Sequence, residues 1–224
     1  MHAFALLYED DHMLAVDKPA GLVVHPTYKN PAGTLLDAIR ARGVPRPSVV
    51  GRLDKLTSGI VIVAKSAEAH ARLQQALAAP DAEKIYLAIV HGCVDVPSGR
   101  IDLKIRVDER DRRHVVVSRD VGAPSVTLFE RLRVTGAGLS LLECRPLTGR
   151  RHQIRAHLAA AGWPIVGDVT YGGEPGQPRH ALHCWRVAFQ NPLQNASESV
   201  DKQSRVLLEA PIPDHFASLL TLLS

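Results

Sequence analysis

The spacing of apolar positions predicts more strands than helices. In Lys84–Val90, Ile85, Leu87 and Ile89 alternate with Tyr86 and its neighbours, which is typical of a strand with one face toward a core. β-rich or alternating runs bounded by turn residues predict further strands. These are Phe4–Tyr8, Met13–Val16, Leu22–His25, Gly59–Ala64, Val115–Ser118, Ser125–Val134, Leu139–Cys144, Ala181–Ala188 and Arg205–Glu209.

Start and stop signals predict four helices. Thr34 is placed to cap a helix over Thr34–Arg42 that ends at Gly43, and Ser66 to cap a second that ends at about Ala79, before Pro80. The other two are Arg151–Ala161 and Asp214–Leu223. Strands outnumber helices and do not alternate with them regularly, which favours an α+β fold with a mostly antiparallel sheet.

The composition places the chain among ordinary globular proteins. Of its 224 residues, 46% are hydrophobic and 22% charged, which excludes disorder as the main state. We find neither a membrane span nor a signal peptide. The polar loops Gly172–Arg179 and Asn191–Ser204 do not look like linkers, so residues 1–224 are expected to form one catalytic domain.

The cysteines indicate the compartment. Cys93, Cys144 and Cys184 are odd in number and form no CxxC motif. A disulfide framework or zinc knuckle is therefore not expected, and a reducing cytoplasm is the natural location. We interpret all three as small buried hydrophobes.

Arginines are concentrated in two stretches that contain no acidic residue. The formal net charge is only +4, but Ala38–Leu53 and Arg145–Arg155 each contain four arginines. Guanidinium groups pair with phosphate oxygens and stay charged, so these clusters favour an anionic partner. A solvated basic face is the alternative. The arginines are Arg40, Arg42, Arg46 and Arg52 in the first stretch, and Arg145, Arg150, Arg151 and Arg155 in the second.

The segment Gly51–Gly59 is a candidate catalytic loop. It places Asp54 between Arg52 and Lys55, and neighbouring positive charge favours the ionised carboxylate that a nucleophile or general base needs. The Thr57-Ser58-Gly59 sequence can hold the loop through side chain-to-backbone hydrogen bonds. An ordinary surface aspartate paired with an arginine is the alternative.

A second segment, Leu147–His157, leads from Gly149 into a helix that carries arginines at its start. Cations are unfavourable at a helix N-terminus, because the helix dipole is positive there. We infer that an anionic ligand explains this choice better than local stability does. An amphipathic helix with a basic polar face is the alternative.

These residues together resemble the RluA family of pseudouridine synthases. Arg52-Leu53-Asp54 followed by Thr57-Ser58-Gly59 is similar to the family's signature loop. Three further segments match in the same order over nearly the whole chain. They are Asp17–Pro26, the strand Lys84–Ala88 with its tyrosine, and Gly149–Leu158 continuing to Pro164–Asp168.

The resemblance implies a fold and a set of site residues. The fold is a mixed, largely antiparallel central sheet with flanking helices, and a cleft between two subdomains that carries Asp54. Asp54 is implied as the catalytic aspartate, Tyr86 as the residue stacking on the target base, and Arg155 as the partner of Asp54. Further residues expected to bind RNA or substrate are Arg52, which holds the flipped nucleotide out of its stack, Thr57, Arg150, His152, Gln153 and Leu182; His183 is placed beside Leu182.

The reaction implied breaks the N-glycosidic bond of a uridine, turns the uracil and rejoins it through carbon. It involves no redox change and no energy input, so neither a cofactor nor a metal is expected. Asp54 acts either on the anomeric carbon or in abstraction of the sugar 2′ proton, and the sequence leaves both routes open. The expected partner is structured ribosomal or transfer RNA, bound by a cytoplasmic monomer with no membrane contact.

Two features depart from the family's pattern. Gly51 stands where the family usually has a histidine before Arg-Leu-Asp. The chain also begins directly at the catalytic domain, without the S4-type RNA-binding domain of many relatives, so recognition is expected to come from the catalytic domain.

Two other classes of protein compete with this interpretation. Eleven histidines invite a metal hydrolase, but His152 and His157 are five residues apart and do not share a helix face. A non-catalytic RNA-binding module is the second, yet it has no need of a carboxylate facing RNA, because carboxylates repel phosphate.

Overall fold

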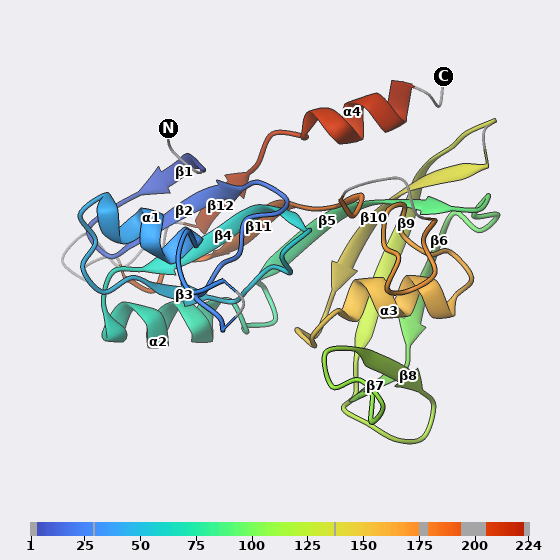
Figure 1. The fold of residues 1–224 in the computed structure, drawn as a ribbon, viewed down its shortest axis with the longest axis horizontal. Coiled ribbons are helices and arrows are strands. Elements are labelled where there is room, and N and C mark those ends of the chain that lie inside the picture. Colours follow the sequence, from blue (N-terminus) through green and yellow to red (C-terminus); the bar gives the residue numbers. More distant parts are fainter. Residues whose placement is uncertain (1–3, 29, 137, 175–178, 194–204, 222–224) are drawn as a thin grey trace. The chain divides into compact units, whose positions relative to one another are not determined.

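The computed structural model describes residues 4–28, 30–136, 138–174, 179–193 and 205–221. The chain forms two compact units, each completed by a segment from late in the sequence. The first contains Met1–Lys84 and Cys184–Pro211, and the second contains Ile85–His183 and Ile212–Ser224. Eight strand pairs of the described residues are antiparallel and helices are few (Figure 1), so the predicted α+β class with a largely antiparallel sheet is confirmed.

The sheet of the first unit is built around β4 (Ser58–Ala64), whose residues are all buried. Its strands run in the order β1-β2-β4-β11, with β3 paired to β4 and β12 paired to β11. These strands are β1 (Ala5–Glu9), β2 (Met13–Lys18), β3 (Ser48–Val50), β11 (Leu182–Gln190) and β12 (Arg205–Glu209).

Two helices lie on opposite sides of these strands and explain why β4 is buried on both faces (Figure 1). Helix α1 (Leu35–Ala41) packs Leu35 and Ile39 into a core with β2 and β4, and α2 (Ala67–Ala76) contacts β3 and β4. Thr34 caps α1 as predicted and forms a reciprocal capping box with Asp37; Ser66 caps α2.

The second unit has strands in the order β5-β10-β9-β6 and a separate hairpin of β7 and β8. The strands are β5 (Glu83–His91), β6 (Ser98–Asp102), β7 (Lys104–Val107), β8 (Val115–Ser118), β9 (Val126–Val134) and β10 (Leu139–Pro146). Helix α3 (Gln153–Ala160) contacts β8, β9 and β10. The unit also contains α4 (Asp214–Thr221).

The predicted strand Leu22–His25 is wrong. The carbonyl groups of Val23 and Val24 instead accept hydrogen bonds from the amides of Leu35 and Leu36 at the start of α1, at 2.8 and 3.2 Å. Those amides have no partner inside the helix, so the segment satisfies helix donors rather than a sheet.

Short strands were the elements that the sequence did not predict. β3 has only three residues, while β6 and β7 are split by Leu103 and carry little alternation. Helix α2 ends at Ala76, three residues earlier than predicted, and continues as turns. The predicted helix end at Leu223, half of the loop Gly172–Arg179 and most of the loop Asn191–Ser204 lie outside the described residues.

The three cysteines differ in their exposure to solvent. Cys144 and Cys184 are buried as predicted, but Cys93 is exposed, so its interpretation as a buried hydrophobe is wrong. Burial raises the pKa of the Cys144 thiol well above its usual range. Among the described residues, no helix combines the length and apolarity that a membrane crossing requires.

Gly59, the last residue of the candidate catalytic loop, lies where the backbones of β4 and β11 approach closely. It has φ +105°, and a Cβ there would lie 2.2 Å from the carbonyl oxygen of Cys184. Gly43 has the same φ but no atom within 4 Å of an added Cβ, which makes it a matched control. We expect Gly43→Ala to lower the free energy of unfolding by ~1–2 kcal/mol, and Gly59→Ala by a further ~1–3 kcal/mol, measured by urea denaturation. Equal losses would contradict a close approach of β4 and β11.

Candidate active site

In the first unit, Asp54 lies in the loop between β3 and β4. Its side chain is half-buried, and its carbonyl oxygen accepts a hydrogen bond from the Thr57 amide at 3.2 Å. Thr57 is buried, whereas Arg52 is exposed. The loop therefore presents the cations of Arg52 and Lys55 at the surface and keeps the Asp54 carboxylate between them partly sheltered.

Lys18, the last residue of β2, anchors this loop by hydrogen bonds to backbone carbonyls. Its side chain is completely buried, and its Nζ donates to three backbone carbonyls: Pro19 at 3.0 Å, Leu22 at 3.2 Å and Lys55 at 3.2 Å. The Lys55 carbonyl also accepts from the Gly21 amide at 2.8 Å. The residue next to Asp54 is thus tied to the Lys18–Leu22 turn by two bonds to one oxygen.

The protonation of Lys18 is linked to Asp54. Burial lowers the pKa of the Lys18 amine to about 8, because it penalises the charged form, while the negative charges of Asp54 and then Asp17 oppose that change. Removing the Asp54 charge would therefore lower the pKa of Lys18 further, and the charged form that holds the loop would be less favoured.

The surroundings of the loop are basic. The pKa of His25 is lowered, first by burial and then by the nearby cations of Arg52 and Arg40. The arginines of this stretch are nevertheless not free of acids in the folded unit: Arg40 pairs with Asp37 and Arg42 with Glu9, both at 3.1 Å. The first acid-free cluster in the sequence is therefore partly neutralised by acids from outside it.

In the second unit, the start of α3 carries four of the predicted site residues. His152 precedes the helix in the left-handed conformation, with φ 53°, the one non-glycine residue with positive φ among those described. Gln153 is buried, and its side chain makes four hydrogen bonds inside the unit. Its Oε1 accepts from Thr148 Oγ1 and the Arg150 amide, and its Nε2 donates to Val126 O and Thr127 Oγ1.

Arg155 forms a buried ion pair within the same unit. Its Nε and Nη2 donate to the two carboxylate oxygens of Asp168 at 2.6 and 2.8 Å. Asp168 is completely buried and Arg155 is 4% exposed. The ring of Tyr171 also lies against the guanidinium, 5.0 Å from its Cζ. A bidentate carboxylate and an aromatic face together fix both the position and the plane of the cation.

Two arginines at the start of α3 have a structural partner that the sequence did not reveal. Arg150 Nε donates to the Pro124 carbonyl at 3.2 Å, and Arg151 Nη2 donates to the carbonyls of Arg112 and His114 at 2.7 and 2.8 Å. Local structure therefore accounts for part of the basic helix start, for which the sequence favoured an anionic ligand over local stability.

Tyr86 lies on β5, opposite Cys144 on β10, and is half-buried. Its neighbours Ile85 and Leu87 are buried, as the predicted alternation requires. Ala88 is also completely buried, so the second face of β5 is covered beyond Tyr86. Leu182 and His183 are both buried at the start of β11.

The structure thus assembles the predicted site residues within each unit. Arg52, Asp54 and Thr57 share one loop of the first, and Arg150, His152, Gln153 and Arg155 surround the start of α3 in the second. The described residues contain no group of three His, Cys, Asp or Glu side chains suited to a metal ion.

Sequence reasoning did not assign roles to Lys18, Asp168 and Tyr171. Lys18 and Asp168 both belong to motifs quoted above. Lys18 lies two residues after the apolar run Met13–Val16, and Asp168 lies two residues after Pro164–Val166. A charge in such a position signals a buried group with a partner. Tyr171 carried no comparable signal.

Comparison with known proteins identifies the family. Residues 12–160 match the family model of RNA pseudouridylate synthases. The chain is 41% identical to "Ribosomal large subunit pseudouridine synthase D" of Xanthomonas campestris, over 97% of this chain and 69% of that protein. It is 38% identical to "Uncharacterized RNA pseudouridine synthase YlyB" of Bacillus subtilis, over 96% of this chain and 71% of that one.

Solved structures agree with this assignment. "Human RNA Pseudouridylate Synthase Domain Containing 1" has a TM-score of 0.74 and 26% identity, over 94% of this chain and 84% of that chain. "Human RNA Pseudouridylate Synthase Domain Containing 4" has the same TM-score at 22% identity, over 98% and 92%, which supports the fold. The chain belongs to the RNA pseudouridine synthases, a family of isomerases, and the resemblance to the RluA family is confirmed.

The buried Lys18 predicts a pH dependence of stability. Because the pKa of its amine in the folded protein is about 8, below the ordinary 10.5, the unfolded chain holds more protons between these pH values. Stability from this group therefore rises as the pH rises from about 8 to 10.5, by up to ~3 kcal/mol. In urea denaturation across this range, the stability of the wild type should rise relative to that of Lys18→Met by this amount, because all other groups contribute equally to both proteins. Parallel curves would show that Lys18 titrates normally.

Proposed function

We propose that this protein converts uridine to pseudouridine in ribosomal RNA, with Asp54 as the catalytic carboxylate. The observation that carries the proposal is the anchored Asp54 loop in a chain of this family. Ribosomal RNA is favoured over transfer RNA because the relatives from several bacteria are named for the large ribosomal subunit.

The reaction breaks the bond from uracil N1 to ribose C1′ and forms a bond from uracil C5 to C1′. The hydrogen on C5 leaves as a proton and N1 gains one, so no oxidant, reductant or energy source is required. Asp54 either attacks C1′ or assists removal of the 2′ proton. Both roles need an ionised carboxylate, and the charge of that carboxylate interacts with the buried Lys18 cation that anchors the loop.

Tyr86 is proposed to stack on the uracil once the nucleotide has left its helix. Flipping costs a few kcal/mol, and stacking on an aromatic ring returns ~1–3 kcal/mol per base. Tyr86 is half-buried on a strand, so its ring is held in place before the base arrives. The exposed Arg52 suits the role of holding the flipped nucleotide through its phosphate.

Arg155 is proposed to act as the partner of Asp54 during the reaction. The bidentate contact with Asp168 fixes the guanidinium plane, which suits a cation that meets a second carboxylate in a set orientation. Among the other expected RNA-binding residues, the exposed Arg150 suits direct contact. The buried Thr57, Gln153 and Leu182 suit support of the loop and of α3.

Tritium release tests the proposal, because C5 loses its hydrogen in the reaction. Wild type and Asp54→Asn are compared on ribosomal and transfer RNA transcripts labelled at C5 of uridine, with the exposed Asp81→Asn as a control. We expect release from ribosomal RNA by wild type and Asp81→Asn. The rate of Asp54→Asn should fall by ~10²–10⁴-fold or more, with RNA binding retained.

Three other results of this assay would contradict the proposal. Substantial turnover by Asp54→Asn would remove Asp54 from the mechanism. Release from transfer RNA alone would overturn the assignment to ribosomal RNA. Tight RNA binding by wild type without release from either pool would favour the RNA-binding module.

Tyr86 predicts a second, independent result. Tyr86→Phe keeps the aromatic ring and is expected to retain most of kcat/KM in the same assay. Tyr86→Leu keeps an apolar side chain but loses the stack, so kcat/KM should fall by ~5–150-fold, the equivalent of one base stack. Equal activities of the two variants would contradict stacking.

A further inference from the structure

The Arg155 guanidinium is held from two sides by one short turn. Asp168 contributes the carboxylate and Tyr171, three residues later, contributes the ring. The carbonyl oxygen of Asp168 accepts from the amides of Tyr171 at 3.1 Å and Gly173 at 2.8 Å, which closes the turn. An added Cβ at Gly173 would lie 2.3 Å from the Ile165 carbonyl oxygen, so the turn is also packed tightly against its own chain.

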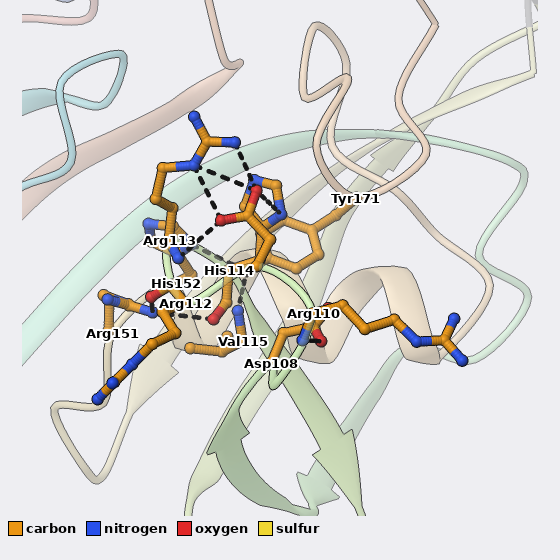
Figure 2. A network of polar contacts seen from close by, with 10 residues as sticks. Asp108, Arg110, Arg112, Arg113, His114, Val115, Arg151, His152 and Tyr171 are labelled. Atoms are coloured by element: carbon orange, nitrogen blue, oxygen red, sulfur yellow. Dashed lines mark hydrogen bonds and ion pairs between the residues drawn. The ribbon is translucent and has the colours of Figure 1, made fainter.

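The hydroxyl of Tyr171 connects two other elements (Figure 2). It accepts a hydrogen bond from the amide of Val115, the first residue of β8, at 3.1 Å. It also lies 2.8 Å from Nδ1 of His152, the residue that precedes α3. One side chain therefore touches the proposed catalytic arginine with its ring and the β7–β8 hairpin with its oxygen.

A second contact, made by Arg151, attaches the loop between β7 and β8 to the segment that precedes α3. Arg151 donates to the carbonyls of Arg112 and His114 at the tip of the loop. The tip is shaped internally by Asp111, which accepts from the Arg113 amide and guanidinium. Arg110, Arg112 and Arg113 are all exposed there, and exposed guanidinium groups suit the phosphate oxygens of an RNA substrate.

We propose that Tyr171 is a positioning residue that links RNA contact at the β7–β8 tip to the orientation of Arg155. The ring holds the guanidinium in the plane that Asp168 defines, and the hydroxyl holds the hairpin in register with the start of α3. Loss of the hydroxyl therefore weakens RNA binding, and loss of the ring slows the chemical step. The inference rests on the proposed roles of Arg155 and Asp54. It assigns separate effects to the ring and the hydroxyl of Tyr171, and each effect can be measured by its own substitution.

The experiment measures kcat and KM for tritium release from ribosomal RNA by Tyr171→Phe and Tyr171→Leu. Tyr171→Phe removes the hydroxyl's contacts with the Val115 amide and with His152 Nδ1, so KM should rise at least ~2–10-fold with kcat close to wild type. Tyr171→Leu should show the same rise in KM and, in addition, a kcat lower by ~2–30-fold, the equivalent of one cation–π contact. Tyr8→Phe is the matched control, because its hydroxyl bonds to Asp10 in the other unit.

Two readouts separate this role from a general loss of structure. KM for wild type should rise with salt, and the slope of log KM against log salt should be shallower in Tyr171→Phe, because fewer phosphates are contacted. Arg112→Gln, a change of an exposed side chain, should raise KM in wild type and much less in Tyr171→Phe. Additive effects of the two substitutions would overturn the link to the hairpin.

A third measurement does not depend on turnover. The Nε proton of Arg155, observed by ¹⁵N–¹H spectroscopy, should exchange with water faster in Tyr171→Leu than in wild type. Its exchange rate should be unchanged in Tyr171→Phe. A wild type that releases no tritium would refute the proposed function, while this signal and the RNA dissociation constants would still test the linkage. Equal kcat for the two Tyr171 variants, or an Arg155 signal that neither changes, would refute the positioning role.

Discussion

The first unit depends on a lysine ammonium that is completely removed from water. Lys18 is stabilised by three backbone carbonyls rather than by a carboxylate in direct contact. Carbonyl dipoles compensate only part of the lost hydration, which is why the pKa of the amine falls to about 8. In return, three chain segments meet at one point: the end of β2, the turn that follows it, and the residue beside Asp54. The backbone beside Asp54 is thus held by bonds to main-chain carbonyl groups.

The second unit buries a cation in a different manner. Arg155 is matched by the full charge of Asp168 and by the face of Tyr171. A buried pair of this kind adds little net stability over an apolar replacement, because both charges lose their hydration. Its value lies in orientation, since a bidentate pair has one favourable geometry. The two units therefore hold their buried cations in different ways. Three backbone carbonyls bind the Lys18 ammonium, and the two oxygens of the Asp168 carboxylate bind the planar Arg155 guanidinium.

Much of the fold and the candidate site could be predicted from local signals. The capped helices at Thr34 and Ser66, the alternation around Tyr86 and the motifs containing Asp54 and Arg155 depend on neighbours in the sequence. What could not be predicted depends on residues brought together by folding. Val23 and Val24 look like a strand but serve the amides of α1, and Arg42 finds Glu9 from a distant strand. The same holds for Arg151, whose partners are carbonyl groups, which leave no trace in side-chain chemistry.

The division of the chain also constrains the order in which the protein can be built. β4 ends at Ala64, but its neighbour β11 joins the first unit only from Cys184, 120 residues later. At ~5–20 residues per second, a ribosome takes several seconds to deliver that strand. Until then the buried edge of β4 has backbone groups without their final partner, and an unpaired apolar edge invites association with other chains. The nascent first unit therefore keeps an open sheet edge until Cys184–Pro211 has been synthesised.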